Sequence, residues 1–329
     1  LDTCLLCRRC ELACPSGVAF GRIMDRAKAE WFANRPRHRL SQIAENPRKL
    51  RAATLLARLA PAWLTRPFPQ LGRAHRLART LYAETPPAAG TYPALKQPAR
   101  GRVGLFAGCA TAAQQGSALN AALLLLRHGG FDVVVPADAG CCGALATHAG
   151  NTARAQAFAA NNQQAFDTEL DAIVSIASGC GTHLAAAEPR LTAPHADICQ
   201  FLLAHDGIHR DDLQPRQQRA LLHTPCSVEN VYRGGSWAAK ILALVPDLQI
   251  EPIGEAGQCC GSAGDYLLRH PITAERLREP LLAAAADSDA DVLLTTNVGC
   301  AMHIAAGLAE RRQQIEVLHP IELLARQLR

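Results

Sequence analysis

The sequence predicts an α/β protein in which a short helical segment and a helical connector precede two repeated small α/β domains with mainly parallel sheets. Three observations predict this fold: a set of four cysteines that occurs twice at a nearly constant offset, apolar runs that end at those cysteines, and a dense cysteine motif near the amino end. The two recurring sets are Cys109, Cys141, Cys142 and Cys180, and Cys226, Cys259, Cys260 and Cys300.

Each repeat alternates apolar strands with helical stretches. Short runs rich in Val, Ile and Leu, bounded by Gly or Pro, predict strands. These runs are residues 102–109, 131–136 and 171–180 in the first copy, and 220–226, 248–253 and 291–300 in the second. Helical patterns lie between them at residues 117–130 and 237–245. Because the strands are uninterrupted apolar runs, we expect parallel sheets covered on both faces.

Composition limits the class of protein. The chain has 329 residues, a formal charge of +5, 49% hydrophobic residues and 19% charged residues, which predicts a globular protein. No apolar run is long enough to span a membrane, and the first residues lack the layout of a signal peptide. Thirteen cysteines without an export signal favour metal or cluster ligation over disulfides. We expect a cysteine-rich segment (1–35), a connector (36–99) and two repeat domains (100–212 and 213–329).

The first cysteines form the motif CxxCxxCxxxCP, which is typical of bacterial-type ferredoxins. The spacing predicts that Cys4, Cys7 and Cys10 bind one [4Fe–4S] cluster, while Cys14 reaches a second cluster. The remaining ligands are expected in a second motif upstream of Leu1. A helix should follow at residues 17–32. The alternative for the four cysteines is a zinc knuckle, although zinc rarely uses four ligands at this spacing.

The repeated cysteines form the second group of candidate ligands. They fall at the carboxyl ends of three predicted strands, the edge where open α/β sheets build their sites, and each pair precedes a glycine, Gly143 or Gly261. Three uses stay open: a cluster or redox site, a zinc site, and plain buried thiols. His183 and His303, three residues after the last cysteine of each set, are possible further ligands. Cys199 aligns with Ile321 and is expected to be a buried apolar residue.

The connector carries the positive excess of the chain. Residues 46–83 contain eight arginine or lysine residues and no acidic residue, with leucines between them. Two interpretations stay open: a solvated helical face, and a surface that docks to an acidic partner or an anionic membrane. No nucleotide, flavin or serine-hydrolase motif is present, and nothing indicates nucleic-acid binding. Electrons should therefore enter and leave through partner proteins.

With these residues in view, the chain resembles the iron–sulfur subunits that carry a ferredoxin-type segment followed by two CCG domains. Their members include subunits of glycolate oxidase, anaerobic glycerol-3-phosphate dehydrogenase, lactate utilisation and heterodisulfide reductase. The resemblance to the glycolate oxidase subunits is strongest. It rests on the strings CELACPSGVAFGRIMD, AGCCGA, ASGCG, QCCGSAGDY and NVGCAMH.

This resemblance implies an oxidoreductase complex in which flavoprotein subunits oxidise glycolate to glyoxylate and this chain passes electrons toward quinone. It implies two [4Fe–4S] clusters in the full-length subunit, no catalysis on the substrate by this chain alone, and a cytoplasmic location, peripheral on the inner face of the membrane. The alternatives are a lactate or glycerol-3-phosphate dehydrogenase complex and a zinc-stabilised scaffold. Heterodisulfide reductases end their CCG pattern in CxxC, whereas both copies here end in CxxH, at His183 and His303.

Overall fold

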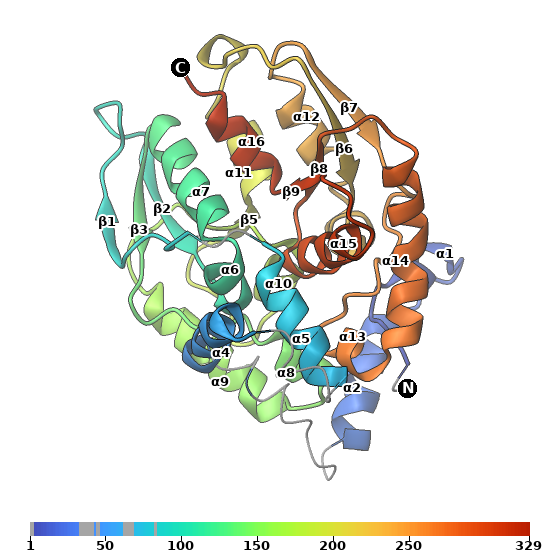
Figure 1. Cartoon of the computed structure of the whole chain (residues 1–329). Coiled ribbons are helices and arrows are strands. Elements are labelled where there is room, and N and C mark those ends of the chain that lie inside the picture. Colours follow the sequence, from blue (N-terminus) through green and yellow to red (C-terminus); the bar gives the residue numbers. More distant parts are fainter. Residues whose placement is uncertain (1–2, 33–42, 44–46, 62–68, 82–83) are drawn as a thin grey trace.

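The computed structural model describes residues 3–32, 43, 47–61, 69–81 and 84–329, and within them two sheets are each flanked by helices (Figure 1). The predicted α/β class with two repeated, mainly parallel units is confirmed. The expected boundary between residues 35 and 36 lies outside the described residues.

The first sheet has the strand order β1-β3-β2-β4-β5. Its strands are β1 (Gly90–Tyr92), β2 (Gly101–Phe106), β3 (Phe131–Val135), β4 (Ala172–Ser175) and β5 (His195–Asp197). Val103 of β2 lies opposite Val133 of β3 and Ala172 of β4, both in parallel register. The exception is β1, which pairs with β3 in antiparallel register. This edge strand comes from the end of the stretch that the sequence assigns to the connector.

The second sheet has the order β7-β6-β8-β9 and is entirely parallel. Its strands are β6 (Gln218–His223), β7 (Leu248–Pro252), β8 (Val292–Thr295) and β9 (Glu316–Leu318). Strand for strand, this order repeats β3-β2-β4-β5 of the first sheet. Within the described residues, only the first sheet carries an additional antiparallel strand.

Helices follow the strands as the apolar spacing predicts. The first repeat contains α6 (Cys109–Gln114), α7 (Gly116–His128), α8 (Ala144–His148), α9 (Thr152–Ala165), α10 (Ser178–Ala185), α11 (Ile198–Ala204) and the 3₁₀ turn η2 (Arg210–Asp212). The second contains the π-helical turn η3 (Ser227–Tyr232), α12 (Trp237–Leu242), α13 (Tyr266–Arg269), α14 (Pro271–Ala286), α15 (Val298–Glu310) and α16 (Pro320–Arg326). Cys199 on α11 is buried in the apolar core, as predicted.

The two repeats share one core through a reciprocal exchange of helix contacts. The closing helix of the second repeat, α16, lies against α7 of the first, and α11 of the first repeat lies against α12 of the second. Phe131, Leu202 and Ile321 belong to this continuous buried cluster, which spans both sheets. His319 adds a direct link, since its Nε2 lies 2.8 Å from the carbonyl oxygen of Ile176. The repeats are therefore joined along a buried seam.

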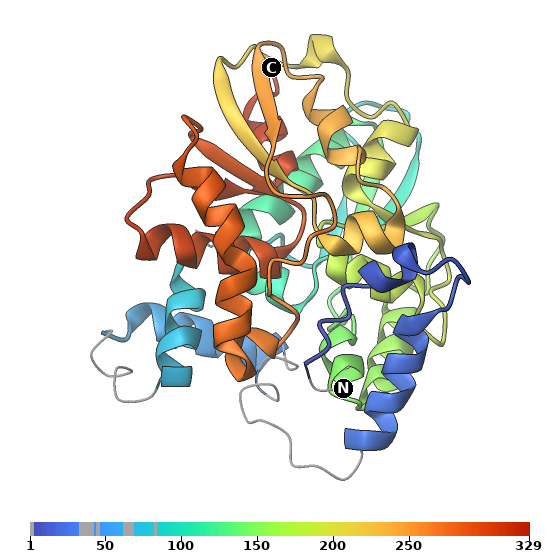
Figure 2. The ribbon, with the colours of Figure 1, turned by 90° about the vertical axis from the view of Figure 1, so that its right-hand side faces the viewer.

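The amino-terminal helices and the connector helices lie outside the two sheets. The amino-terminal helices are α1 (Arg9–Ala13) and α2 (Phe20–Phe32), and the connector helices are α4 (Pro47–Leu59) and α5 (Pro69–Arg79). Figure 2 shows α2 beside the helices of the first repeat, and the contacts join α2 to α8 and α1 to η3. Helix α4 contacts α6, whereas α5 contacts α13 and α15. Both peripheral segments thus contact both repeats.

Candidate cysteine-rich redox site

Both recurring cysteine sets line one cavity. Its volume is about 650 Å³, and the eight cysteines on its wall are Cys109, Cys141, Cys142, Cys180, Cys226, Cys259, Cys260 and Cys300. They stand there because parallel strands end at the same edge of a sheet and the seam brings the two edges together. In each repeat one cysteine follows the first strand, two follow the second and one follows the third. The placement agrees with the expectation from sequence that each set converges.

In the first set, Cys109 and Cys141 have their Sγ atoms 3.5 Å apart. The amide N–H of Gly143 donates to Cys141 Sγ over 3.4 Å. Hydrogen bonds from the Cys109 and Cys142 thiols, with the Gly143 amide and the charge of His183, lower the pKa of Cys141 well below its ordinary value. Cys141 is therefore the thiol of the first set for which the surroundings favour the thiolate, and a thiolate is the form that binds metal.

The second set repeats this arrangement. Cys260 and Cys300 have their Sγ atoms 2.9 Å apart, and every cysteine of the set is free of a disulfide. A hydrogen bond from the Cys226 thiol lowers the pKa of Cys259, and the amide of Gly261 acts in the same direction. The residue with a lowered thiol pKa is thus the first cysteine of the vicinal pair in both repeats.

The two histidines after the last cysteines lie in different surroundings. His183 lines the cavity, and its Nε2 is 3.4 Å from Thr147 Oγ1. His303 lines a separate small hollow beside Arg278, and its Nε2 lies 3.2 Å from the carbonyl oxygen of Ala274. Burial and the charge of Arg278 lower the pKa of His303 to about 4, so this ring is neutral. The structure brings His183 to its cysteine set and does not bring His303 to the second.

The chemistry of the donor set fits a thiolate-ligated cluster. Among the described residues, no three His, Cys, Asp or Glu side chains surround one point as a single metal ion requires. Four cysteines at one sheet edge, two of them adjacent in sequence, supply soft sulfur donors, which are the ligands that iron–sulfur clusters use.

The amino-terminal cysteines lie on an irregular loop that leads into α1. Leu6 and Arg8 have positive φ values of 52° and 58°, which turn the loop tightly between Cys4 and Cys10. Burial raises the pKa of Cys7, and the charges of Cys4 and Cys10 act on it as well. Cys14 lies beyond α1, where the backbone amides of Ser16, Gly17 and Val18 lower the pKa of its thiol. Lys28 of α2 is buried, and its Nζ donates to the carbonyl oxygen of Cys4 over 3.2 Å.

This loop is anchored on the second repeat. Asn230 Nδ2 on η3 donates to the carbonyl oxygens of Cys7 and Gly257, over 2.7 and 3.0 Å. Arg9 forms an ion pair with Glu255 over 2.5 Å. Cys7 is close enough to the second set for the charge of Cys259 to raise the pKa of Cys7, and for the charge of Cys7 to raise the pKa of Cys226. The amino-terminal cysteines and the second set are therefore neighbours, which the sequence does not predict.

Two residues of η3 that were not candidates lie beside the site. Asn230 is one, and Tyr232 is the other: its hydroxyl lies 3.3 Å from His195 Nδ1, while His195 Nε2 is 2.9 Å from Ser175 Oγ. Burial and the nearby Asp197 and cysteine charges raise the pKa of Tyr232. The signal for both residues in the sequence is the stretch directly after Cys226, which is polar and lacks an apolar helical pattern.

The fold and these cysteine sets define a protein with two cysteine-rich α/β domains. A family model described as a cysteine-rich domain, CCG, matches residues 103–185 and 220–305. The chain is 30% identical over 343 residues to the glycolate oxidase iron-sulfur subunit of Escherichia coli (strain K12), covering 97% of this chain and 81% of that protein. It therefore belongs to the family of iron–sulfur oxidoreductase subunits with paired CCG domains.

Other relatives carry related descriptions. The probable glycolate oxidase iron-sulfur subunit of Bacillus subtilis (strain 168) is 25% identical over 98% of this chain and 81% of that protein. Lactate utilization protein A of Bacillus velezensis is 25% identical over 68% of this chain and 98% of that protein. In the described part of the chain, no helix combines the length and apolar character needed to cross a bilayer.

Proposed function

We propose that this chain is the electron-transfer subunit of a glycolate-oxidising complex. It would accept electrons from flavoprotein subunits that oxidise glycolate to glyoxylate and pass them toward quinone. Glycolate releases two electrons and two protons in this oxidation, and a quinone that becomes a quinol takes up two of each. The complex would lie in the cytoplasm, peripheral on the inner face of the membrane.

The observation that carries this proposal is the continuous series of cysteine groups. Cys7 lies within electrostatic reach of Cys259, and the second set shares one cavity with the first. Cys4, Cys7 and Cys10 would hold one [4Fe–4S] cluster, and Cys14 would reach a second. When bound, such clusters accept and release single electrons, which links a two-electron flavin to a distant acceptor. Asn230 and Arg9 hold the loop against the second set and thereby fix the separation of the groups.

The names of the relatives support glycolate as the substrate of the complex, and the match to lactate utilization protein A makes lactate the second candidate. Steady-state rates of the purified complex with glycolate, lactate and glycerol 3-phosphate decide among these. Iron, sulfide and zinc contents of the anaerobically purified subunit test the remaining alternative, because a zinc-stabilised scaffold would contain stoichiometric zinc and no iron.

The first prediction concerns Cys7→Ser in the full-length subunit assembled with its flavoproteins. Loss of one thiolate should remove the paramagnetic signal of one cluster and lower quinone reduction at least about tenfold, because electrons lose their route away from the flavin. Flavin reduction by glycolate, followed by its absorbance, should stay unchanged.

Cys199→Ala is the matched control, since Cys199 is a buried cysteine in the apolar core and does not line the cavity. It should retain the signal and the quinone activity. Unaltered quinone reduction by Cys7→Ser, with its iron content intact, would contradict the assignment.

A further inference from the structure

Helix α4 has two apolar faces, which is unusual for a helix at the surface of a globular protein. Leu50, Thr54 and Ala57 face the cavity that holds the cysteine sets. Leu55 and Leu59 lie on the opposite side, and Leu56, which also lines the cavity, lies between the two faces; the three side chains are 59%, 75% and 67% exposed, respectively. A row of leucines this exposed costs free energy in water, because each side chain leaves apolar surface hydrated.

The exposed row is held in place by a network of side-chain contacts to the backbone. The guanidinium of Arg58 donates to the carbonyl oxygens of Ala78 and Leu81, over 3.1 and 2.9 Å. His75 Nε2 and Arg79 Nη1 lie 2.9 and 3.2 Å from the carbonyl oxygen of Ala60. These contacts tie the end of α4 to α5, so the leucine face of α4 is presented on a fixed helical pair.

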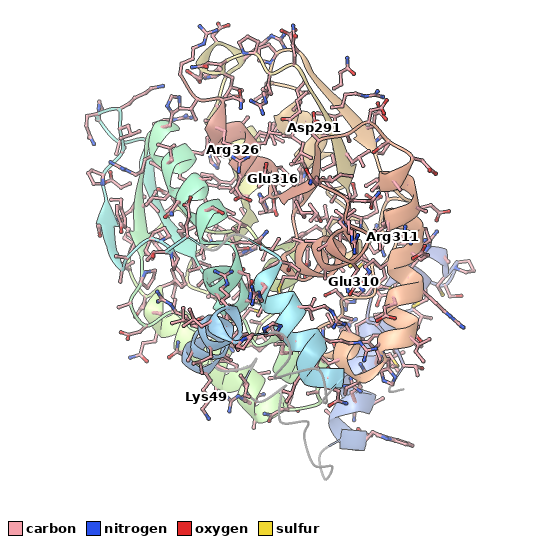
Figure 3. All side chains as sticks on the ribbon, in the orientation of Figure 1. Lys49, Asp291, Glu310, Arg311, Glu316 and Arg326 are labelled. Atoms are coloured by element: carbon pink, nitrogen blue, oxygen red, sulfur yellow. The ribbon has the colours of Figure 1, made fainter. Side chains whose placement is uncertain are left out.

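The second helix of the pair is clamped to the second repeat by ion pairs. Arg73 lies 3.5 Å from Glu275, and Arg76 lies 3.3 Å from Glu310. Figure 3 shows Glu310 at the end of α15, on the side that faces α5. Part of the positive charge of the connector is therefore used to attach it to the rest of the protein.

Basic residues of α4 lie beside the leucines. Lys49 and Arg51 are exposed, and Figure 3 shows Lys49 at the outer edge of α4. Arg51, Leu55 and Leu59 are spaced four residues apart and so share one face of the helix. No acidic residue occurs between residues 46 and 83. An aliphatic face flanked by basic residues alone matches an anionic lipid surface, where leucines enter the acyl boundary and the cations meet phosphate groups.

Two exposed leucines of the connector helices also line the cavity. Leu56 and Leu71 both line it, and they are 67% and 43% exposed. The wall that α4 and α5 contribute also includes Ala53, Ala57 and Ala74, with Thr54 and His75 as its polar members. An apolar molecule that entered at Leu56 would therefore meet a largely apolar wall on the way to the cysteine sets.

We propose that α4 lies in the surface of an anionic phospholipid bilayer, with Leu55, Leu56 and Leu59 inserted, and that this places the opening of the cavity against the lipid. The lipid-soluble quinone of the proposed function then enters from the bilayer through the opening at Leu56 and Leu71. This inference rests on the proposed function for the identity of the acceptor. The lipid contact itself depends only on α4.

Vesicle binding tests the lipid contact. The full chain should cosediment with vesicles of phosphatidylglycerol and phosphatidylcholine, bind pure phosphatidylcholine more weakly, and be released by high salt. The variant Leu55→Ser/Leu56→Ser/Leu59→Ser should weaken binding by on the order of a hundredfold, and Arg51→Gln by about fivefold. Leu95→Ser is the control, since Leu95 is 50% exposed but lies outside the connector helices, and it should bind as the unaltered chain does.

A comparison of two acceptors separates this inference from the proposed function. In the assembled complex, the variant Leu55→Ser/Leu59→Ser, which leaves the cavity residue Leu56 in place, should lose reduction of a long-chain quinone embedded in vesicles and keep reduction of a short-chain, water-soluble quinone. Failure of the unaltered chain to bind anionic vesicles overturns the inference, as does binding that the triple variant retains. A triple variant that still binds vesicles but assembles more weakly with the flavoprotein would also overturn the inference. If the unaltered complex reduces neither quinone, the proposed function fails instead.

Discussion

Single residues decide how closely the backbone approaches the cysteines. Gly143 and Gly261, which follow the vicinal pairs, have φ values of +91° and +88°, in the left-handed region. An added Cβ at Gly261 would lie 2.5 Å from the carbonyl oxygen of Ala274, whereas at Gly143 the nearest atom would be His183 Nε2 at 3.2 Å. The glycines were recognisable in the sequence as turn residues. Their different surroundings were not, because they depend on α14 and α10 arriving from elsewhere in the chain.

Gly261→Ala should therefore destabilise the protein more than Gly143→Ala. Both changes place alanine at positive φ at a cost of about 1 kcal/mol, and Gly261→Ala adds a collision with backbone that cannot rotate away. The free energy of unfolding, from denaturant titration, is the measurement. Gly17→Ala isolates the conformational cost, since Gly17 has φ +62° and open space around its Cα. Equal losses at positions 143 and 261 would refute the steric account.

At the scale of elements, the repeats differ where the helices that follow β4 and β8 begin. Asn297 caps α15, and its Oδ1 accepts from the amides of Gly299 and Cys300, over 2.9 and 3.4 Å. Its Nδ2 lies 3.4 Å from both Ser178 Oγ and Ser227 Oγ, which joins the starts of α10 and η3. The first repeat has Ala177 at the corresponding cap and a shorter helix. The strand before each helix is predictable from its apolar run. The contacts of Asn297 with the two serines are not, because they depend on how the two repeats pack together.

Asn297→Ala should lower the free energy of unfolding by about 1 to 2 kcal/mol, because two amides at the start of α15 lose their acceptor. Asn297→Asp keeps the acceptor and loses the donor to the serines, so it should fall between Asn297→Ala and the unaltered protein. Thermal and denaturant unfolding measure the order. A variant Asn297→Ala as stable as the unaltered protein would show that the cap contributes nothing.

At the scale of the whole molecule, the sequence predicted the repeat, the sheets and the cysteine edges, but not how the halves meet. Apolar runs and their spacing are local signals, and they sufficed for β2 to β4 and β6 to β8. The contacts of α16 with α7 and of α11 with α12 join segments that are far apart in the sequence, so local signals do not predict them. The same holds for the shared cavity and for the orientation of His303, whose spacing matches that of His183 although its surroundings do not.

The seam also makes stability sensitive to acid. His319 is buried between the repeats, and burial lowers its pKa to about 4. The His319 Nε2 atom faces the carbonyl oxygen of Ile176, and its Nδ1 atom accepts a hydrogen bond from the amide N–H of Ile321. A second proton on the ring would occupy Nδ1, and the amide of Ile321 would then lose its acceptor. The unfolded chain binds a proton below about pH 6.5 and the folded chain only near pH 4, so stability falls as pH decreases between these values. Burial lowers the pKa of His195 and His223 to about 4 as well.

His319→Asn should reduce the loss of stability between pH 7 and pH 5 by about 2 kcal/mol, since one fewer buried imidazole must be deprotonated in the folded state. Asp197 opposes this trend, because burial raises its pKa to about 6, but it is one group against several histidines. Denaturant titrations at a series of pH values give the slope. His209→Asn, at an exposed position, is the control and should leave the slope unchanged. If the free energy of unfolding of His319→Asn falls with decreasing pH as steeply as that of the unaltered protein, His319 does not contribute to the acid sensitivity.

The reciprocal contacts of α16 with α7 and of α11 with α12 have a further consequence for the thiols. Neither half encloses its own cysteines, since one chamber wall is supplied by the other half. Loosening of the joint would add a route from water by which oxidants reach both sets at once. Close packing of the two repeats thus also limits oxidation of the thiols.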